Sequence, residues 1–276
     1  MASLSAFAAL RDALDVRYRT ASSAAFVQAQ GTVLATGLES LDRALSGGFP
    51  KGAISTLEGA ASSGRTALSA SLLATASADG GAAALVDWRD DPAGSVFAPS
   101  LAAAGVALER LLIVRVGAAL DVMRAADILL RSGAFGAVVI PAVSASSRIG
   151  AATWTRLANL AHRADAVLLV VGSEISTELS YFASLRVECA LERTLWDGAP
   201  GLFRRFAGYE LCAQVRKHKR AAPGGEARLQ VEATDASCAC SSRSSETASS
   251  RGGSGSSART GSGGRRCAAG LRSATC

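Results

Sequence analysis

Short apolar segments alternate with helical stretches through the middle of the chain, and this alternation constrains the fold more than any other feature. The apolar segments are too short for buried helices and are rich in Val, Ile, Leu and Ala, which favours strands. They lie at 53–57, 82–88, 111–116, 137–140 and 166–171. Helical stretches separate them at 65–78, 96–104, 120–132 and 151–163. The pattern predicts an α/β fold, with a mostly parallel sheet and helices on both faces.

The rhythm changes after Tyr181. Three further apolar segments, at 185–195, 206–217 and 228–232, follow one another with no helical stretch between them. Consecutive strands joined without a crossover helix pair antiparallel. We therefore expect an antiparallel extension at one side of the parallel sheet.

The chain divides by composition into three parts. Residues 1–30 form a predicted helical segment, in which Leu4, Phe7, Leu10 and Leu14 make one apolar stripe. Such a stripe covers its own domain or docks on a partner, and the sequence leaves both readings open. Residues 31–234 form the predicted core domain.

Residues 235–276 form a predicted disordered tail, because Ser, Gly and Arg dominate it and large apolar residues are almost absent. It is either a genuine basic tail or the product of a frameshift in a GC-rich gene. It carries +4 of the net charge of +6, so the body is nearly neutral and only weak, nonspecific DNA binding is expected. Cys238 and Cys240 lack the spacing of a zinc site, so we expect no metal.

The chain of 276 residues is 49% hydrophobic, which is enough for a substantial core. It has no uncharged apolar stretch long enough to cross a membrane and no basic run followed by an apolar core at its start. We therefore expect a globular cytoplasmic protein.

The sharpest local signal is a phosphate-loop-like segment between a predicted strand and a predicted helix. A phosphate loop has the form GxxxxGK[ST], in which backbone amides and the lysine hold the phosphates and the hydroxyl holds Mg²⁺. Here Gly59, Ser63, Gly64 and Thr66 fit the pattern, but Arg65 replaces the lysine. Because a planar guanidinium is a poor substitute for a flexible ammonium, binding of ATP and Mg²⁺ is in doubt and no cofactor is assigned.

An NTPase also needs a carboxylate at the end of a neighbouring strand to hold Mg²⁺. The predicted strand at 137–140 runs into Pro141 instead. Asp87, Asp90 and Asp91 follow another strand, and they either substitute for the missing carboxylate or solvate the strand end. Arg65 in place of the lysine and Pro141 in place of the carboxylate both argue against efficient hydrolysis of ATP. No catalytic residue is therefore assigned.

The order of these segments resembles the core of the bacterial recombinase RecA. The resemblance runs from about Thr36 to Val231. Its motifs are Thr36-Gly37 with Ser40-Leu41-Asp42, the loop Gly59–Thr66, Leu85-Val86-Asp87, Ala104-Gly105-Val106 with Leu111-Leu112, Leu130-Arg131-Ser132-Gly133, Tyr181-Phe182-Ala183-Ser184-Leu185-Arg186, and Val215-Arg216-Lys217-His218-Lys219-Arg220-Ala221-Ala222-Pro223.

The resemblance implies roles for the last of these runs. Lys217 and Lys219 are similar to two lysines that reach the nucleotide of the adjacent subunit, and the alternative is a solvated basic strand end. Arg216, Lys217, Lys219 and Arg220 together are candidate contacts to a neighbouring subunit or to DNA, with Arg204 and Arg205 as further sources of DNA affinity.

Two departures from RecA weaken the case for strand exchange. Arg89 stands near the position of the family's catalytic glutamate. The segments 141–150 and 172–180, which follow the fourth and fifth core strands, are short where the family has long DNA-binding loops. Strand exchange is therefore not expected.

A shortened RecA-like chain with an eroded site resembles the ImuA group of inducible-mutagenesis proteins. The motifs are Phe97-Ala98-Pro99-Ser100-Leu101-Ala102-Ala103-Ala104-Gly105-Val106, Leu111-Leu112-Ile113-Val114-Arg115, and Ala125-Ala126-Asp127-Ile128-Leu129-Leu130-Arg131-Ser132-Gly133. The resemblance implies a non-catalytic accessory protein of DNA-damage-induced (SOS) translesion synthesis, with RecA, an ImuB-type polymerase homologue and an error-prone polymerase as partners. Two alternatives stay open, an active RecA-type DNA-dependent ATPase of repair and recombination and a SulA-like cell-division inhibitor.

Overall fold

The structure is a computed structural model that describes residues 32–78, 80–91, 96–143, 149–198, 203–233 and 238–242. The predicted segment at 1–30, with its apolar stripe, lies outside the described residues. So does most of the predicted tail.

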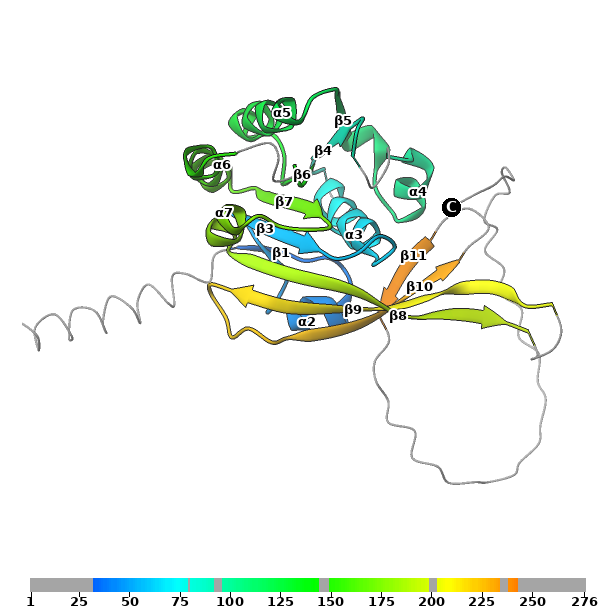
Figure 1. Ribbon diagram of the computed structural model, residues 1–276. Coiled ribbons are helices and arrows are strands. Elements are labelled where there is room, and N and C mark those ends of the chain that lie inside the picture. Colours follow the sequence, from blue (N-terminus) through cyan, green and yellow to red (C-terminus); the bar gives the residue numbers. More distant parts are fainter. Residues whose placement is uncertain are drawn as a thin grey trace, which may run out of the picture.

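Helices and strands alternate as the apolar pattern predicts (Figure 1). The helices are α2 (Glu39–Ala44), α3 (Arg65–Ser77), α4 (Ala98–Ala103), α5 (Ala119–Ser132), α6 (Ala151–Ala164) and α7 (Thr177–Phe182). The strands are β1 (Val33–Leu34), β2 (Phe49–Pro50), β3 (Ala53–Glu58), β4 (Ala83–Trp88), β5 (Leu111–Val116), β6 (Ala137–Pro141), β7 (Val167–Gly172), β8 (Leu185–Asp197), β9 (Arg205–His218), β10 (Glu226–Ala233) and β11 (Cys238–Ser242).

Nine strands form one mixed sheet in the order β11-β10-β9-β8-β3-β7-β6-β4-β5. From β8 to β5 neighbouring strands are parallel, whereas β8, β9, β10 and β11 pair antiparallel. The prediction of a parallel sheet with an antiparallel extension is therefore confirmed. The strand β8 joins the two parts, because it runs parallel to β3 and antiparallel to β9.

The sheet separates two hydrophobic cores (Figure 1). Residues of α2, α3 and α4 pack on one face, and residues of α5, α6 and α7 pack on the other. In β4 the side chain of Leu85 enters the first core and that of its neighbour Val86 enters the second. Burial on both faces explains why the parallel strands are continuous apolar runs rather than alternating ones.

The helix α7 was not anticipated, since residues 172–180 were expected to be a loop. The hydroxyl of Ser176 caps the helix by accepting a hydrogen bond from the backbone N–H of Leu179 at 3.2 Å, and Leu179 is buried in the second core. A helix of six residues is too short to show a hydrophobic period, which is why the sequence pattern did not predict it.

The strand β11 lies within the segment 235–276, which was expected to lack structure. It pairs antiparallel with β10, with Val231 opposite Cys240. An edge strand presents unpaired N–H and C=O groups, and these can pair with a neighbouring segment of any composition. Backbone pairing of this kind leaves no mark on the hydrophobic pattern of the sequence.

None of the helices in the described part of the chain is long and apolar enough to cross a membrane.

Candidate functional site: the phosphate loop and its surroundings

The phosphate-loop-like segment connects β3 to α3, as its sequence context predicts. Gly59 has φ +154°, and a Cβ there would lie 2.2 Å from the carbonyl oxygen of Cys189. Gly64 has φ +86°, and a Cβ there would lie 2.2 Å from Cδ2 of Leu211. Both positions therefore need glycine, and β8 and β9 press directly on the loop.

The loop presents polar groups suited to an anion. The helix α3 begins at Arg65, so the N–H groups of its first turn have no partners within the helix. Ser63 is 2% exposed, and its hydroxyl has no hydrogen-bond partner among the described residues. Thr66 is exposed on the first turn of α3. The glycines, Ser63 and Thr66 thus fit a bound phosphate.

Arg65, at the position of the phosphate-binding lysine, is half-buried and interacts with the carboxylate of Asp91. Burial lowers the pKa of the Arg65 guanidinium, and the nearby carboxylate of Asp91 acts in the opposite direction. The residue at the lysine position is therefore a partly desolvated cation whose charge is already opposed. The carboxylate of Asp91 therefore offsets part of the attraction of Arg65 for phosphate.

Pro141 and Asp87, at two strand ends beside the loop, offer Mg²⁺ no free carboxylate. Pro141 ends β6 and is buried opposite Val171 of β7. Asp87 is 4% exposed, and its two oxygens accept hydrogen bonds from the N–H of Val96 at 3.3 Å and from Nε of Arg115 at 3.1 Å. Asp87 was expected to be a magnesium ligand or a solvated strand end, but it is a buried residue that anchors neighbouring segments. Pro141 and Asp87 therefore do not fit Mg²⁺ held in the manner of an NTPase, whereas Asp90 is exposed after the same strand as Asp87.

Two ion pairs line a hollow next to the loop that the sequence did not predict. Glu58, the last residue of β3, accepts a hydrogen bond at 2.6 Å from Nη2 of Arg186, whose Nη1 donates to Ser180 at 2.6 Å. Glu188 pairs with Arg216. These pairs border an open hollow of about 610 Å³ together with Gly59, Ala60 and Ser173. A glutamate immediately before Gly59 was visible in the sequence, but its partner comes from a strand about 130 residues later in the chain.

Most side chains of the basic run at the end of β9, residues 216–220, form hydrogen bonds or ion pairs within the same chain. Nζ of Lys217 donates to the carbonyl oxygens of Ser180 and Tyr181 at 2.7 and 3.1 Å, and Nζ of Lys219 donates to that of Phe182 at 3.3 Å. These carbonyls end α7, where a helix has unpaired acceptors and negative partial charge.

The remaining cations of this run differ in their surroundings. Arg216 is paired with Glu188, and Arg220 is exposed. Burial, and then the charges of Lys219 and Arg186, lower the pKa of Lys217. The run therefore combines a helix cap, an ion pair and a solvated residue. That lysines at 217 and 219 reach a nucleotide in another subunit stays a prediction.

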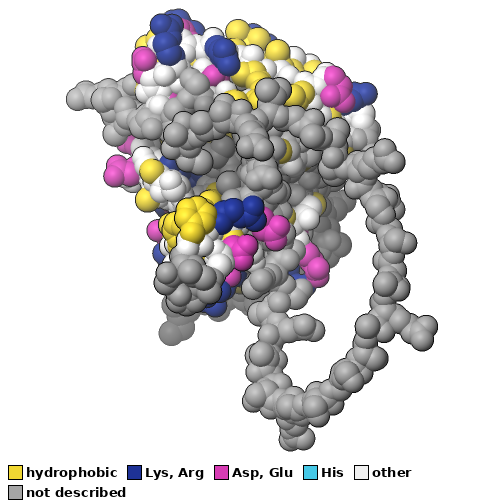
Figure 2. All heavy atoms as spheres, turned by 90° about the vertical axis from the view of Figure 1, so that its right-hand side faces the viewer, with side chains coloured by type: hydrophobic (Ala, Val, Ile, Leu, Met, Phe, Trp, Pro, Cys, Tyr) yellow, Lys and Arg dark blue, Asp and Glu magenta, His cyan; other side chains and the backbone are white. Residues whose placement is uncertain are grey.

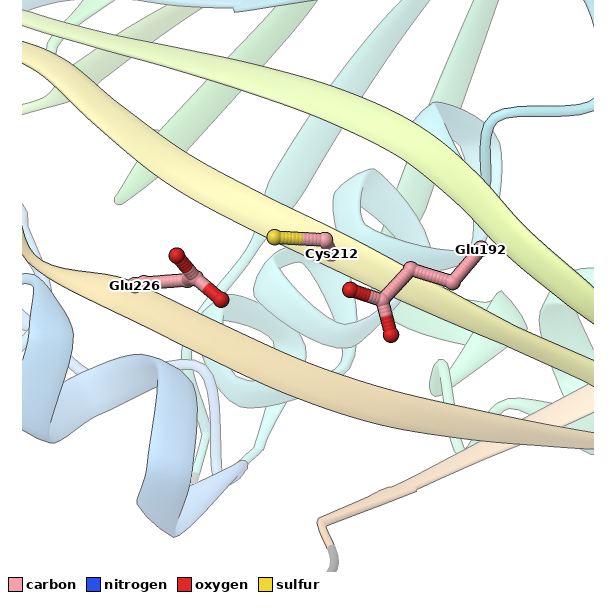
Figure 3. A group of neighbouring side chains, drawn as sticks. All are labelled: Glu192, Cys212 and Glu226. Atoms are coloured by element: carbon pink, nitrogen blue, oxygen red, sulfur yellow. The ribbon is translucent and has the colours of Figure 1, made fainter.

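A cluster of Glu192, Cys212 and Glu226 lies on the outer face of β8, β9 and β10 (Figure 3). Burial, and then the two glutamates, raise the pKa of Cys212 to about 11, so its sulfur is a thiol near neutral pH. Nε of Arg228 lies 3.3 Å from Glu192 and 3.4 Å from Glu226. The arginine already supplies the cation for both carboxylates.

The chain is similar in sequence to RecA proteins. A family model of the RecA N-terminal domain matches residues 21–150. Protein RecA of Prochlorococcus marinus (strain AS9601) is 39% identical over 114 residues, which cover 41% of this chain and 30% of that protein. Protein RecA of a Picosynechococcus species is 27% identical over 231 residues, which cover 71% of this chain and 64% of that protein. The chain thus spans 30% of the length of the first of these relatives.

A solved structure extends the likeness to the fold. The crystal structure of the RadB recombinase superposes with a TM-score of 0.55 at 18% identity, covering 72% of this chain and 96% of that chain. The architecture is therefore the α/β fold of RecA-like proteins. The family model and the RecA relatives support a place in the RecA-like recombinase superfamily.

Proposed function

We propose that this protein is a RecA-like accessory factor of DNA repair, acting in damage-induced translesion synthesis, that works through protein contacts without turning over ATP. One observation carries the proposal. Pro141 and the fully engaged Asp87 occupy the strand ends from which a magnesium carboxylate would come. The opposed charge of Arg65 adds to it. The resemblance to ImuA proteins supplies the partners: RecA, an ImuB-type polymerase homologue and an error-prone polymerase.

The intact glycine cradle favours a second candidate, an active RecA-type DNA-dependent ATPase of repair and recombination. Gly59 and Gly64 keep the close approaches that a phosphate loop needs. Ser63 also keeps an unpartnered buried hydroxyl next to them.

A genetic complementation experiment separates the candidates. A strain that lacks the gene is complemented with the wild type or with the double variant Arg65→Ala, Thr66→Ala, and mutation frequency and survival after ultraviolet damage are measured. The accessory role predicts that the deletion lowers induced mutagenesis and that the double variant restores it as well as the wild type. If the wild type restores survival and the double variant does not, the result supports the second candidate, an active DNA-dependent ATPase. Filamentous cells on overexpression without any damage phenotype would instead support a division inhibitor.

A further inference from the structure

The end of the hairpin formed by β8 and β9 carries aromatic side chains that the protein itself leaves exposed. Phe203 is 92% exposed, Trp196 is 49% exposed and Phe206 is 39% exposed. The rings of Trp196 and Phe206 meet edge to face, with centroids 5.8 Å apart. We call the described residues 196–198 and 203–206 the hairpin tip. Figure 1 shows the hairpin extending beyond the body of the sheet.

The two arms of the hairpin meet closely at this tip. Gly198 has φ +112°, and a Cβ there would lie 3.0 Å from the carbonyl oxygen of Phe203 and 3.5 Å from Cα of Arg204. A side chain at position 198 would therefore meet the opposite arm of the hairpin. The two arms lie close together here, which places Phe203 and Arg204 beside the end of β8.

Of the arginines on the β8–β9 hairpin, the two at the tip have the weakest ion pairing with the rest of the protein. Arg204 is exposed and forms no ion pair within the described part of the chain. Arg205 lies 4.0 Å from Asp197, and both side chains are at least 70% exposed, so solvent screens their attraction. Arg193, further along β8, is by contrast held by Glu210 through hydrogen bonds of 2.7 and 2.9 Å.

Several of the basic residues that the sequence offered as DNA contacts are paired within the protein and are therefore less available to phosphates. Arg216 is paired with Glu188, and Lys217 and Lys219 cap α7. Arg204, Arg205 and the exposed Arg220 remain, and of these Arg204 and Arg205 lie next to exposed rings. Figure 2 looks onto the side toward which the hairpin extends and shows hydrophobic side chains directly beside Lys or Arg and Asp or Glu.

We infer that the hairpin tip is a contact site for single-stranded nucleic acid, separate from the phosphate loop. Unpaired bases stack on exposed aromatic rings, and guanidinium groups pair with the phosphates between them. A duplex would not offer its base faces to Trp196 or Phe203, because they are stacked within the helix. The recognition is independent of base sequence, since every base has a face that can stack.

A fluorescence titration of the full chain with oligothymidine tests this inference. Among the three tryptophans, Trp154 is 3% exposed and Trp88 is half-buried, so Trp196 is the one whose emission a stacked base should quench. We expect quenching that disappears in Trp196→Phe, while most of the affinity persists because the ring remains. Trp196→Ala should weaken binding at least about fivefold, as expected for the loss of one stacked base.

The salt dependence tests the arginines separately. The double variant Arg204→Ala, Arg205→Ala should lower the slope of log affinity against log salt by roughly 1.4, the value for two phosphate contacts on a single strand. Two substitutions on α5 serve as controls. Ile128→Ala is the control for Trp196→Ala, because it removes an exposed hydrophobic side chain (68% exposed) away from the tip. Arg124→Ala is the control for the arginine variant, because it removes an exposed arginine that is paired with Asp121. Both controls should leave the affinity and the slope unchanged.

Two results would overturn the inference. The first is oligothymidine binding with unchanged affinity in Trp196→Ala and in the double arginine variant. The second is no binding by the full chain at low salt. Either result would leave the aromatic tip as a surface for a protein partner instead. Neither result bears on ATP turnover, so the proposed accessory function stands or falls on its own experiment.

Discussion

Glu58 and Arg186 join the strand that leads into the phosphate loop to the first strand of the antiparallel extension, with 2.6 Å between Oε1 and Nη2. Their side chains are 13% and 26% exposed, so removing one partner leaves the other charge poorly hydrated. The same arginine donates to Ser180 of α7. The pair therefore connects β3, β8 and α7 at the edge of the candidate site.

Arg186→Ala should lower the free energy of unfolding by roughly 1–3 kcal/mol, because Glu58 loses a charged hydrogen-bond donor while remaining largely buried. Urea denaturation measures the loss. Glu58→Gln in the Arg186→Ala background should recover part of it. The control Arg43→Ala breaks a pair with Glu39 whose side chains are 72% and 75% exposed, and it should change stability by less than about 0.5 kcal/mol. Equal effects of the two arginine substitutions would show that the Glu58 pair is not structural.

Gly64→Ala should be more destabilising than Gly80→Ala, although the two backbones are alike. Their φ angles are +86° and +88°, so each substitution costs about 1–2 kcal/mol for the left-handed conformation. A Cβ at Gly64 also collides with Leu211, whereas no atom of the residues that the structure describes lies within 4 Å of a Cβ at Gly80. The additional collision should cost about 1–3 kcal/mol. Similar thermal unfolding of the two variants would contradict the close packing of β9 on the loop.

The alternating α/β fold was predictable because burial on both faces imposes continuous apolar strands separated by helices. The antiparallel extension was predictable because its apolar segments follow one another with no helical stretch between them. Pairings between distant residues, such as Glu58 with Arg186, were not predictable, since nothing local in the sequence selects one of several charged partners. The buried position of Asp87 was hidden in the same way, because its donors come from Val96 and Arg115 on later segments.

Asp91→Asn should strengthen the binding of triphosphate to the loop, because it removes the carboxylate that opposes Arg65. A fluorescent nucleotide analogue, titrated without magnesium, measures the affinity. The control Asp121→Asn removes a carboxylate of α5 that is paired with Arg124. It should have no effect. Weaker binding in Asp91→Asn would mean that Asp91 positions Arg65 for phosphate rather than competing with it.

Cys189 should make the stability of the protein fall at alkaline pH. Burial raises the pKa of its thiol from 9.0 to about 12, so the folded state keeps a proton that the unfolded state loses. The stabilisation is complete below about pH 9 and is lost as the pH rises toward 12. Between about pH 8 and about pH 10, the wild type should lose about 1.4 kcal/mol more than Cys189→Ala in urea denaturation. Parallel pH profiles for the two proteins would exclude this contribution.

The N-terminal stripe should mediate docking on a partner protein. Phe7→Asp with Leu14→Asp replaces two apolar residues of that stripe, in a segment outside the described residues. We expect the folded double variant to lose co-purification with RecA or with the polymerase homologue. Unchanged partner binding would indicate that the stripe covers its own domain.

The central claim is that this RecA-like protein works without hydrolysing ATP. The most direct measurement is the rate of phosphate release from ATP and Mg²⁺ by the full chain, with and without single-stranded DNA, for the wild type and Arg65→Lys. We expect both proteins to stay below about 1 per second under every condition, because Arg65→Lys restores the cation but leaves Pro141 where the magnesium carboxylate is needed. DNA-stimulated turnover in the usual enzyme range of about 1–1,000 per second by the wild type would contradict the account.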